Sequence, residues 1–238
     1  MLGGCRRTRR IRVVVKLLTA VYLLTLLGCA ARQMPIRIER GITPNPVSGP
    51  SVHIAPVEDR RTFEVSGSDP VPHQMATQGV EDPATRARAI AQIRTAGARP
   101  YADLLLPEGQ SAASLTRDAL AQAFRDAKFA VLKPNDPGFA SSIPVNAAVL
   151  RFWSWNTGSW TFTFQFETVV LITADIPPFE PGEEVRGYVR LHSAMGASER
   201  SFRNTTNKGL DEFVANVSAR LEAGKRETPD REPVALTN

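Results

Sequence analysis

Cysteine is scarce in this chain, because Cys5 and Cys29 are the only two among 238 residues. Both lie within the first 29 positions, so the remainder of the chain cannot form a disulfide, bind zinc through thiolates or use a cysteine nucleophile. A domain built from the remaining residues must therefore depend on its own hydrophobic core.

Acidic residues are absent before position 29, and long apolar runs are absent as well. The uncharged run Leu17–Leu27 has 11 residues, whereas a membrane-spanning helix needs about 20. A basic segment, a short apolar run and a small residue, Gly28, immediately before Cys29 are typical of the secretory signal of bacterial lipoproteins. In that class the chain is cut before the cysteine, whose thiol and new amine are acylated. We therefore predict a signal peptide at residues 1–28 and lipidation of Cys29.

An excess of positive charge is missing from the mature chain. Of 29 basic residues, five arginines and one lysine precede Cys29, which leaves 23 against 24 acidic residues. The pI of 9.6 therefore belongs to the signal. Because nucleic-acid binding needs a basic domain, we expect no nucleic-acid partner.

Composition divides the mature chain into three parts. Residues 29–50 are rich in proline and glycine and lack a periodic apolar pattern, which indicates a lipidated, extended and solvated tether. Residues 51–222 carry the periodic apolar patterns of a folded periplasmic domain. Residues 223–238 are charged and contain proline, which favours a disordered tail.

Apolar periodicity predicts the elements of the domain. We expect two helices, at Ser111–Lys128 and Asn207–Leu221, the second ended by Gly224, and loop at Phe63–Pro83. The segment Ala89–Thr95 suits either a hairpin with Pro100–Leu106 or part of a helix from Thr85. The other expected strands are Val52–Val57, Phe129–Leu132, Val145–Trp155, Trp160–Asp175 and Val185–Ala194. These elements predict an α+β fold, a mostly antiparallel sheet with two helices packed on one face, lipid-anchored through a flexible N-terminal tether.

Three features resemble the YajG family of bacterial lipoproteins. They are Leu26-Leu27-Gly28-Cys29, a first strand that ends in Glu58-Asp59-Arg60-Arg61, and the helix around Ala119–Ala127 followed by a short strand. Lys128 stands where that family usually has glycine. The resemblance implies a periplasm-facing α+β domain and supplies no catalytic residues.

Motifs of common enzymes are also missing, including the nucleophile elbow, the phosphate-binding loop and the dinucleotide fingerprint. The histidines that remain after cleavage, His53, His73 and His192, lack the spacing of metal ligands. We therefore predict no metal, no cofactor and no enzymatic activity.

Asp59 and Arg61, at the end of the first strand, are candidate contacts for a partner. The alternative, which we favour, is an ion pair that holds the strand to a neighbouring loop.

All three tryptophans, Trp153, Trp155 and Trp160, gather at one hairpin. They suit either an exposed platform for a protein, glycan or lipid partner or cross-strand packing.

These observations predict a non-enzymatic lipoprotein with a binding or assembly-support domain, anchored by lipid to a membrane. Its expected partner is an envelope protein or the cell wall. Ala30, where inner-membrane lipoproteins of many Gram-negative bacteria have aspartate, favours the periplasmic face of the outer membrane. Alternatives are an accessory lipoprotein of a transport or flagellar assembly, or an envelope hydrolase with a dispersed site. A deep pocket joining His53 or His192 to carboxylates would favour the hydrolase, and a flat sheet with exposed tryptophan would favour the binding protein.

Overall fold

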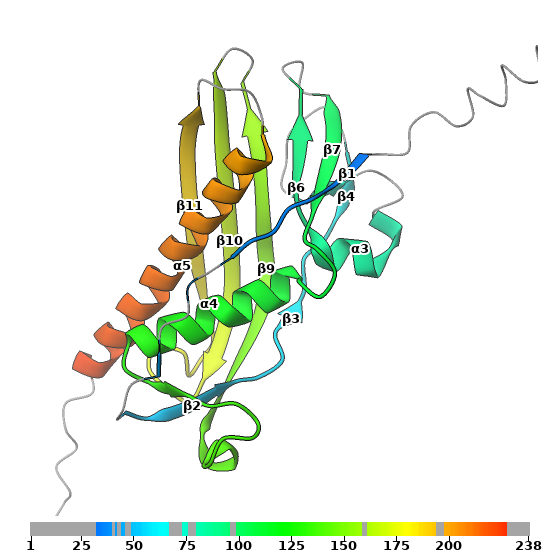
Figure 1. Cartoon of the computed structure of the whole chain (residues 1–238). Helices are drawn as coiled ribbons and strands as arrows, with labels where there is room; N and C mark the ends of the chain where they lie inside the picture. The colour runs from blue at the N-terminus through cyan, green and yellow to red at the C-terminus, as the bar shows by residue number, and fades with distance from the viewer. Residues whose placement is uncertain are drawn as a thin grey trace, which may run out of the picture. The chain divides into compact units, whose positions relative to one another are not determined.

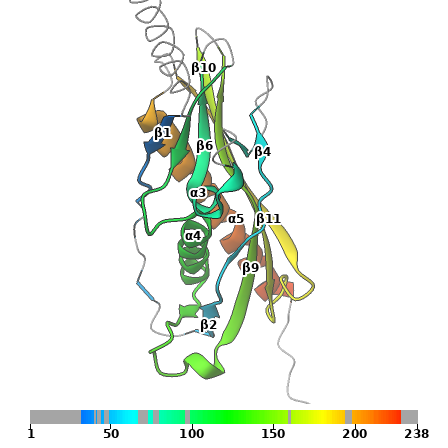
Figure 2. The ribbon, with the colours of Figure 1, turned by 90° about the vertical axis from the view of Figure 1, so that its right-hand side faces the viewer.

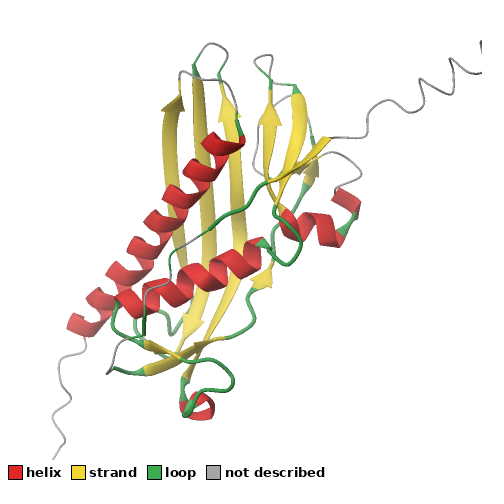
Figure 3. Cartoon of the chain, viewed as in Figure 1, coloured by secondary structure: helices red, strands yellow, loops and turns green. Residues whose placement is uncertain are grey.

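The computed structural model describes residues 32–39, 41, 44–45, 49–66, 73–75, 80–95, 99–158, 161–193 and 198–227. The fold is of the α+β class (Figures 1 and 3). The strands are β1 (Arg32–Pro35), β2 (Ser51–Ile54), β3 (Glu58–Asp59), β4 (Glu64–Val65), β5 (Gln74–Met75), β6 (Ala89–Arg94), β7 (Pro100–Leu105), β8 (Ala130–Val131), β9 (Ile143–Thr157), β10 (Phe162–Ala174) and β11 (Glu183–Ser193). The helices are α3 (Pro83–Arg88), α4 (Ala112–Asp126) and α5 (Glu199–Glu227), with a short 3₁₀ turn at Phe139–Ser141.

Nine strands form one mixed sheet in the order β1-β7-β6-β9-β10-β11, with β2 and β3 beside β9 and β8 beside β2. The long pairings, β6 with β7, β9 with β10 and β10 with β11, are antiparallel. Five shorter pairings among the described strands, including β4 with β5 and β6 with β9, are parallel. The expected fold class is confirmed, but a mostly antiparallel sheet is not, because short segments return to β9 in the parallel direction.

The two long helices cover one face of the sheet, as the apolar stripes predict (Figure 2). Ser111 caps α4 by accepting a hydrogen bond from the Ser114 backbone N–H, and Ser114 reciprocates. The core contains the α4 stripe from Leu115 to Ala127 and the α5 stripe Leu210, Phe213, Val214, Val217 and Leu221. A Cβ at Gly209 of α5 would lie 2.1 Å from Phe166 on β10, so only glycine permits this close approach.

The hairpin predicted at Ala89–Thr95 and Pro100–Leu106 is confirmed as β6 and β7. The competing helix exists only as α3, which ends at Arg88. Asp82 caps α3 by accepting hydrogen bonds from the Ala84 and Thr85 backbone amides.

The expectation of a solvated tether at residues 29–50 is wrong for its described middle part. β1 pairs with β7, the Ile36 N–H donates to the Leu105 carbonyl at 2.8 Å, and Ile36 and Ile38 are each 1% exposed. Met34, Ile36 and Ile38 alternate along the chain, so an extended segment places all three on one face, against the core. This short alternation is hidden among prolines in the sequence. Cys29 and residues 1–28 lie outside the described residues.

Gly224 does not end the last helix, because α5 continues to Glu227. Gly224 is buried, and a Cβ there would lie 2.4 Å from the Pro177 carbonyl oxygen. The glycine therefore allows the helix to pass close to the turn after β10, and the expected boundary at residue 222 is too early. Residues 228–238 of the expected tail lie outside the described residues.

Candidate functional site

Trp153 and Trp155 lie on the sheet face opposite to α4 and α5, where the segment from β3 to β5 covers part of that face. Trp153 is 1% exposed and forms a second buried cluster with Met75, Ala89 and Leu105. Phe63 packs edge-on against Trp153 at 6.1 Å between ring centroids. Trp155 is half-buried against the same cluster, and Trp160 lies outside the described residues. An exposed platform is therefore wrong for Trp153, which is a packing residue.

Arg61 is buried and connects several elements from inside the fold. Its guanidinium donates to both carboxylate oxygens of Asp59, at 2.8 and 2.7 Å. It also donates to the carbonyls of Ala89 at 2.7 Å and Arg86 at 2.8 Å, and it lies over the Phe63 ring. The Arg61 side chain is 0% exposed and the Asp59 side chain 23%. A group so enclosed cannot meet a partner, so this geometry fits the internal ion pair rather than a binding contact.

His73 is held as a neutral acceptor beside this ion pair. Its Nε2 accepts a hydrogen bond from the Phe152 backbone N–H at 3.1 Å, and its ring contacts Trp153 and Phe63. Burial, reinforced by the positive charge of Arg61, lowers the pKa of His73 from 6.5 to about 3. The neutral ring therefore anchors the start of β5 to β9. Sequence reasoning missed this role because His73 lies between prolines in a stretch interpreted as loop.

A buried polar layer lies beside this cluster. Gln92 Nε2 donates to Asp103 Oδ1 at 2.9 Å and to Ser66 Oγ at 2.6 Å. The Arg94 guanidinium donates to Gln74 Oε1 at 2.5 Å, and Asn156 exchanges hydrogen bonds with the Arg94 backbone. These contacts join β4 and β5 to β6, β7 and β9. The only signal in the sequence is the polar character of Gln92 and Asp103 within two predicted strands.

His53 forms a pair with a serine, but the hydrogen bonding opposes nucleophilic use. Ser142 Oγ lies 2.8 Å from His53 Nδ1 and donates its hydrogen to the Phe139 carbonyl at 2.6 Å. Because a hydroxyl has one hydrogen, His53 Nδ1 must donate to Ser142 and cannot take its proton. His192 lies on the other side of the fold, where it contacts Thr163. The structure therefore does not join either histidine to a carboxylate by a hydrogen bond among the described residues.

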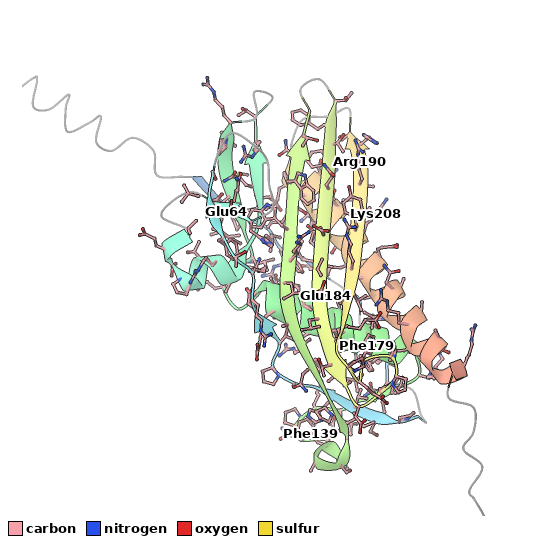
Figure 4. All side chains as sticks on the ribbon, turned by 180° about the vertical axis from the view of Figure 1, so that it is seen from behind. Glu64, Phe139, Phe179, Glu184, Arg190 and Lys208 are labelled. Carbon is pink, nitrogen blue, oxygen red and sulfur yellow. The ribbon has the colours of Figure 1, made fainter. Side chains whose placement is uncertain are left out.

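The outer face of β10 and β11 carries polar side chains and no helix (Figure 4). Glu167 is 7% exposed at its side chain and accepts from Arg151 at 3.1 Å and from Arg186 at 2.8 Å. Arg186 also lies over the ring of Tyr188, whose hydroxyl donates to Gln165. These contacts brace a charged surface. Arg186, Tyr188, Arg190 and His192 alternate along β11 and are all exposed, so they share its outer face.

β11 is the edge strand of the sheet, and α5 covers only half of its edge. Asn216 donates to the Arg186 carbonyl at 2.9 Å, and Arg220 donates to the Glu184 carbonyl at 3.2 Å. Alternate residues of a strand point their N–H and C=O groups to opposite edges, so Tyr188, Arg190 and His192 point theirs to the same edge. Within the described part of the chain, these three residues receive no such cap. We call the backbone groups of Tyr188, Arg190 and His192 the free β11 edge.

The described residues contain neither a cluster of metal ligands nor a membrane-spanning helix. No three histidine, cysteine, aspartate or glutamate side chains among them gather closely enough to hold a metal ion. None of the helices that the structure describes has both the length and the apolar character needed to cross a membrane.

No protein-family model matches this chain, and no curated protein sequence matches it. Among solved structures, the chain is similar to a Xanthomonas campestris protein that carries the family model DUF330. That alignment has a TM-score of 0.48 and 14% identity, and covers 82% of this chain and 98% of the other. A second, uncharacterised protein aligns with a TM-score of 0.38 and 11% identity, over 79% of this chain and 97% of that one.

Proposed function

We propose that this chain is an outer-membrane lipoprotein, anchored through acylated Cys29, whose periplasmic domain binds another envelope protein without catalysing a reaction. The anchor rests on Leu26–Cys29 and on the resemblance to YajG lipoproteins. The binding function rests on one observation, the free β11 edge.

The free β11 edge is suited to strand addition. An uncapped edge offers a row of N–H and C=O groups on which an extended peptide can form a further strand. Proteins usually protect such edges, and α5 does so at Glu184 and Arg186 through Arg220 and Asn216. The half of β11 that stays open is therefore the part available to a partner.

The side chains on this half favour an acidic extended segment as the partner. Arg190 and His192 project from the outer face beside Tyr188, which is 37% exposed. In Figure 4, Arg190 lies near one end of β11 and Glu184 lies toward the other end. Complementary charge at a rim mainly sets association rate and specificity, whereas backbone pairing supplies affinity.

A proline scan of β11 tests this function. Arg190→Pro removes an outward N–H and places a ring where a partner strand would lie, a position at which edge strands tolerate proline. Arg190→Ala removes only the side chain. The full-length lipidated protein, purified from solubilised envelope, should retain its captured partner with Arg190→Ala and lose it with Arg190→Pro. Val189→Pro is the control for orientation, because the Val189 N–H faces β10 and its loss should destabilise the fold. Equal capture by Arg190→Pro and wild type would refute strand addition.

The anchor has its own test. Cys29→Ala should leave the signal uncleaved and remove the acyl mass that intact-mass analysis of the wild type should show on Cys29. Two or more acyl chains give stable anchoring where one is marginal. A variant that is processed and membrane-bound like the wild type would contradict lipidation.

A further inference from the structure

A groove of about 710 Å³ lies between β2, the outward side of α4 and the segment that follows β8. Its volume falls within the range of about 300–1,000 Å³ that is usual for small-molecule sites. The groove shares no residue with the free β11 edge, so it requires an explanation of its own.

The floor of the groove is apolar. It is made by Ile54, Ala121, Val131, Leu132 and Phe139. His53 holds one wall in place, because its Nδ1 hydrogen-bonds Ser142 while its ring lies 4.4 Å from the Phe139 ring. Figure 4 shows Phe139 in the turn before β9, at the end of the sheet. Four of the five floor residues, all except Val131, are only half-buried, so they leave apolar surface open to the groove.

The rim of the groove is cationic. Arg117, Arg125 and Lys133 line it, with Asp118 as the only acidic lining residue that the structure describes. Arg125 is oriented by Asn45, whose side-chain oxygen accepts from Nε at 2.9 Å. Arg117 lies 3.6 Å from the exposed Asp118 carboxylate, whereas neither Arg125 nor Lys133 pairs with a carboxylate within the described residues. This excess of positive charge stands out in a mature chain that has 23 basic and 24 acidic residues.

We propose that this groove binds a fatty acid, with the acyl chain on the apolar floor and the carboxylate at the rim formed by Arg117, Arg125 and Lys133. An apolar floor beside a cationic rim matches a single-chain anionic amphiphile in both hydrophobicity and charge. Arginine suits a carboxylate because its guanidinium can donate two parallel hydrogen bonds. The membrane anchor expected at Cys29 would keep the groove near a source of such molecules.

Photo-crosslinking of the full-length protein in phosphatidylcholine nanodiscs tests the proposal. The probes are a diazirine-bearing dodecanoic acid and the corresponding uncharged alcohol. The acid should crosslink to peptides that contain residues 117–125 and 131–139, and the alcohol should do so more weakly. Labelling spread evenly over the domain, or equal labelling by both probes, would overturn the proposal.

Two variants separate the floor from the rim. Ala121 is half-buried and lines the groove, so Ala121→Leu should fill part of the groove and reduce labelling by both probes. Arg117→Gln with Lys133→Gln should lower labelling by the acid about fivefold, since the two exposed ion contacts together contribute about 1 kcal/mol, and should leave the alcohol unchanged. Lys208→Gln on α5, marked in Figure 4, is the matched control of charge and should change neither. Acid labelling that survives Ala121→Leu, or that falls equally with Lys208→Gln, would refute this site.

Discussion

The two faces of the central sheet are covered in different ways. On the inner face, α4 and α5 bury regular apolar stripes against β9, β10 and β11. On the outer face, an irregular segment with β3, β4 and β5 covers Trp153 and relies on buried polar groups, notably Arg61 and His73. Among the described residues, no helix covers the outer face of β10 and β11. The comparison teaches that regular apolar stripes stabilise one face, whereas contacts between residues far apart in sequence stabilise the covered part of the other.

The largest expected effect lies on the inner face. Val217→Asp places an unpaired charge against the sheet, where Val217 is 0% exposed, and should destabilise the domain by more than about 4 kcal/mol. Glu222→Ala, which removes an exposed pair with Lys225, should cost less than about 0.5 kcal/mol. Urea denaturation measures both. Similar small losses would mean that α5 is not docked.

On the outer face, Trp153→Ala tests whether the covered part is a true core. Removing this buried ring should cost about 3–5 kcal/mol of unfolding free energy, with partner capture retained by the molecules that stay folded. Thermal unfolding and a pull-down of the same sample separate stability from binding. Unchanged melting with lost capture would instead support an exposed tryptophan surface.

Arg61→Ala tests the buried polar contacts of the segment that covers Trp153. It removes a guanidinium that satisfies the Asp59 carboxylate and several backbone carbonyls, and should cost about 3 kcal/mol. Arg60→Ala is the neighbouring control, because Arg60 pairs with Glu58 in solvent and exposed pairs contribute less than about 1 kcal/mol. Equal effects of the two substitutions would show that the segment is not fixed by Arg61.

The smallest effect concerns pH. Because the folded pKa of His73, about 3, lies below its unfolded value of 6.5, the stability that neutral His73 contributes is complete above pH 6.5. It is lost as the pH falls toward 3. Between pH 7 and 5 this loss should reach about 2 kcal/mol, at about 1.4 kcal/mol per pH unit. His73→Gln, which keeps an acceptor, should flatten the profile in denaturant titrations. An unchanged slope would place His73 in solvent.

The inner face could be predicted from sequence because its signals are periodic. The spacing of Leu115, Ala119 and Phe124 in α4, and of Leu210, Phe213 and Val217 in α5, repeats over several turns. The alternation of Phe162, Phe164 and Phe166 likewise identified β10. Such patterns extend over several turns or strand positions, so they can be recognised even where one residue departs from them.

The segment from β3 to β5 that covers part of the outer face could not be predicted, because its position depends on contacts between residues far apart in sequence. Arg61 donates hydrogen bonds to the carbonyls of Ala89 and Phe152, and His73 accepts one from the Phe152 backbone N–H. No local sequence pattern predicts these contacts. The strands β4 and β5 are also too short to show a pattern, because each has two residues. The burial of Ile36 and Ile38 was not predicted for a related reason, since an alternation of three residues among prolines is too short to recognise.

Amide hydrogen exchange along β11 tests the central claim most directly. In the lipidated protein alone, the amides of Tyr188, Arg190 and His192 should exchange quickly, while those of Val189 and Leu191, which face β10, should exchange slowly. When the captured envelope partner is bound, the three outward amides should become as protected as their neighbours. Outward amides that are already protected in the free protein, or that stay unprotected in the complex, would contradict a binding function at this edge.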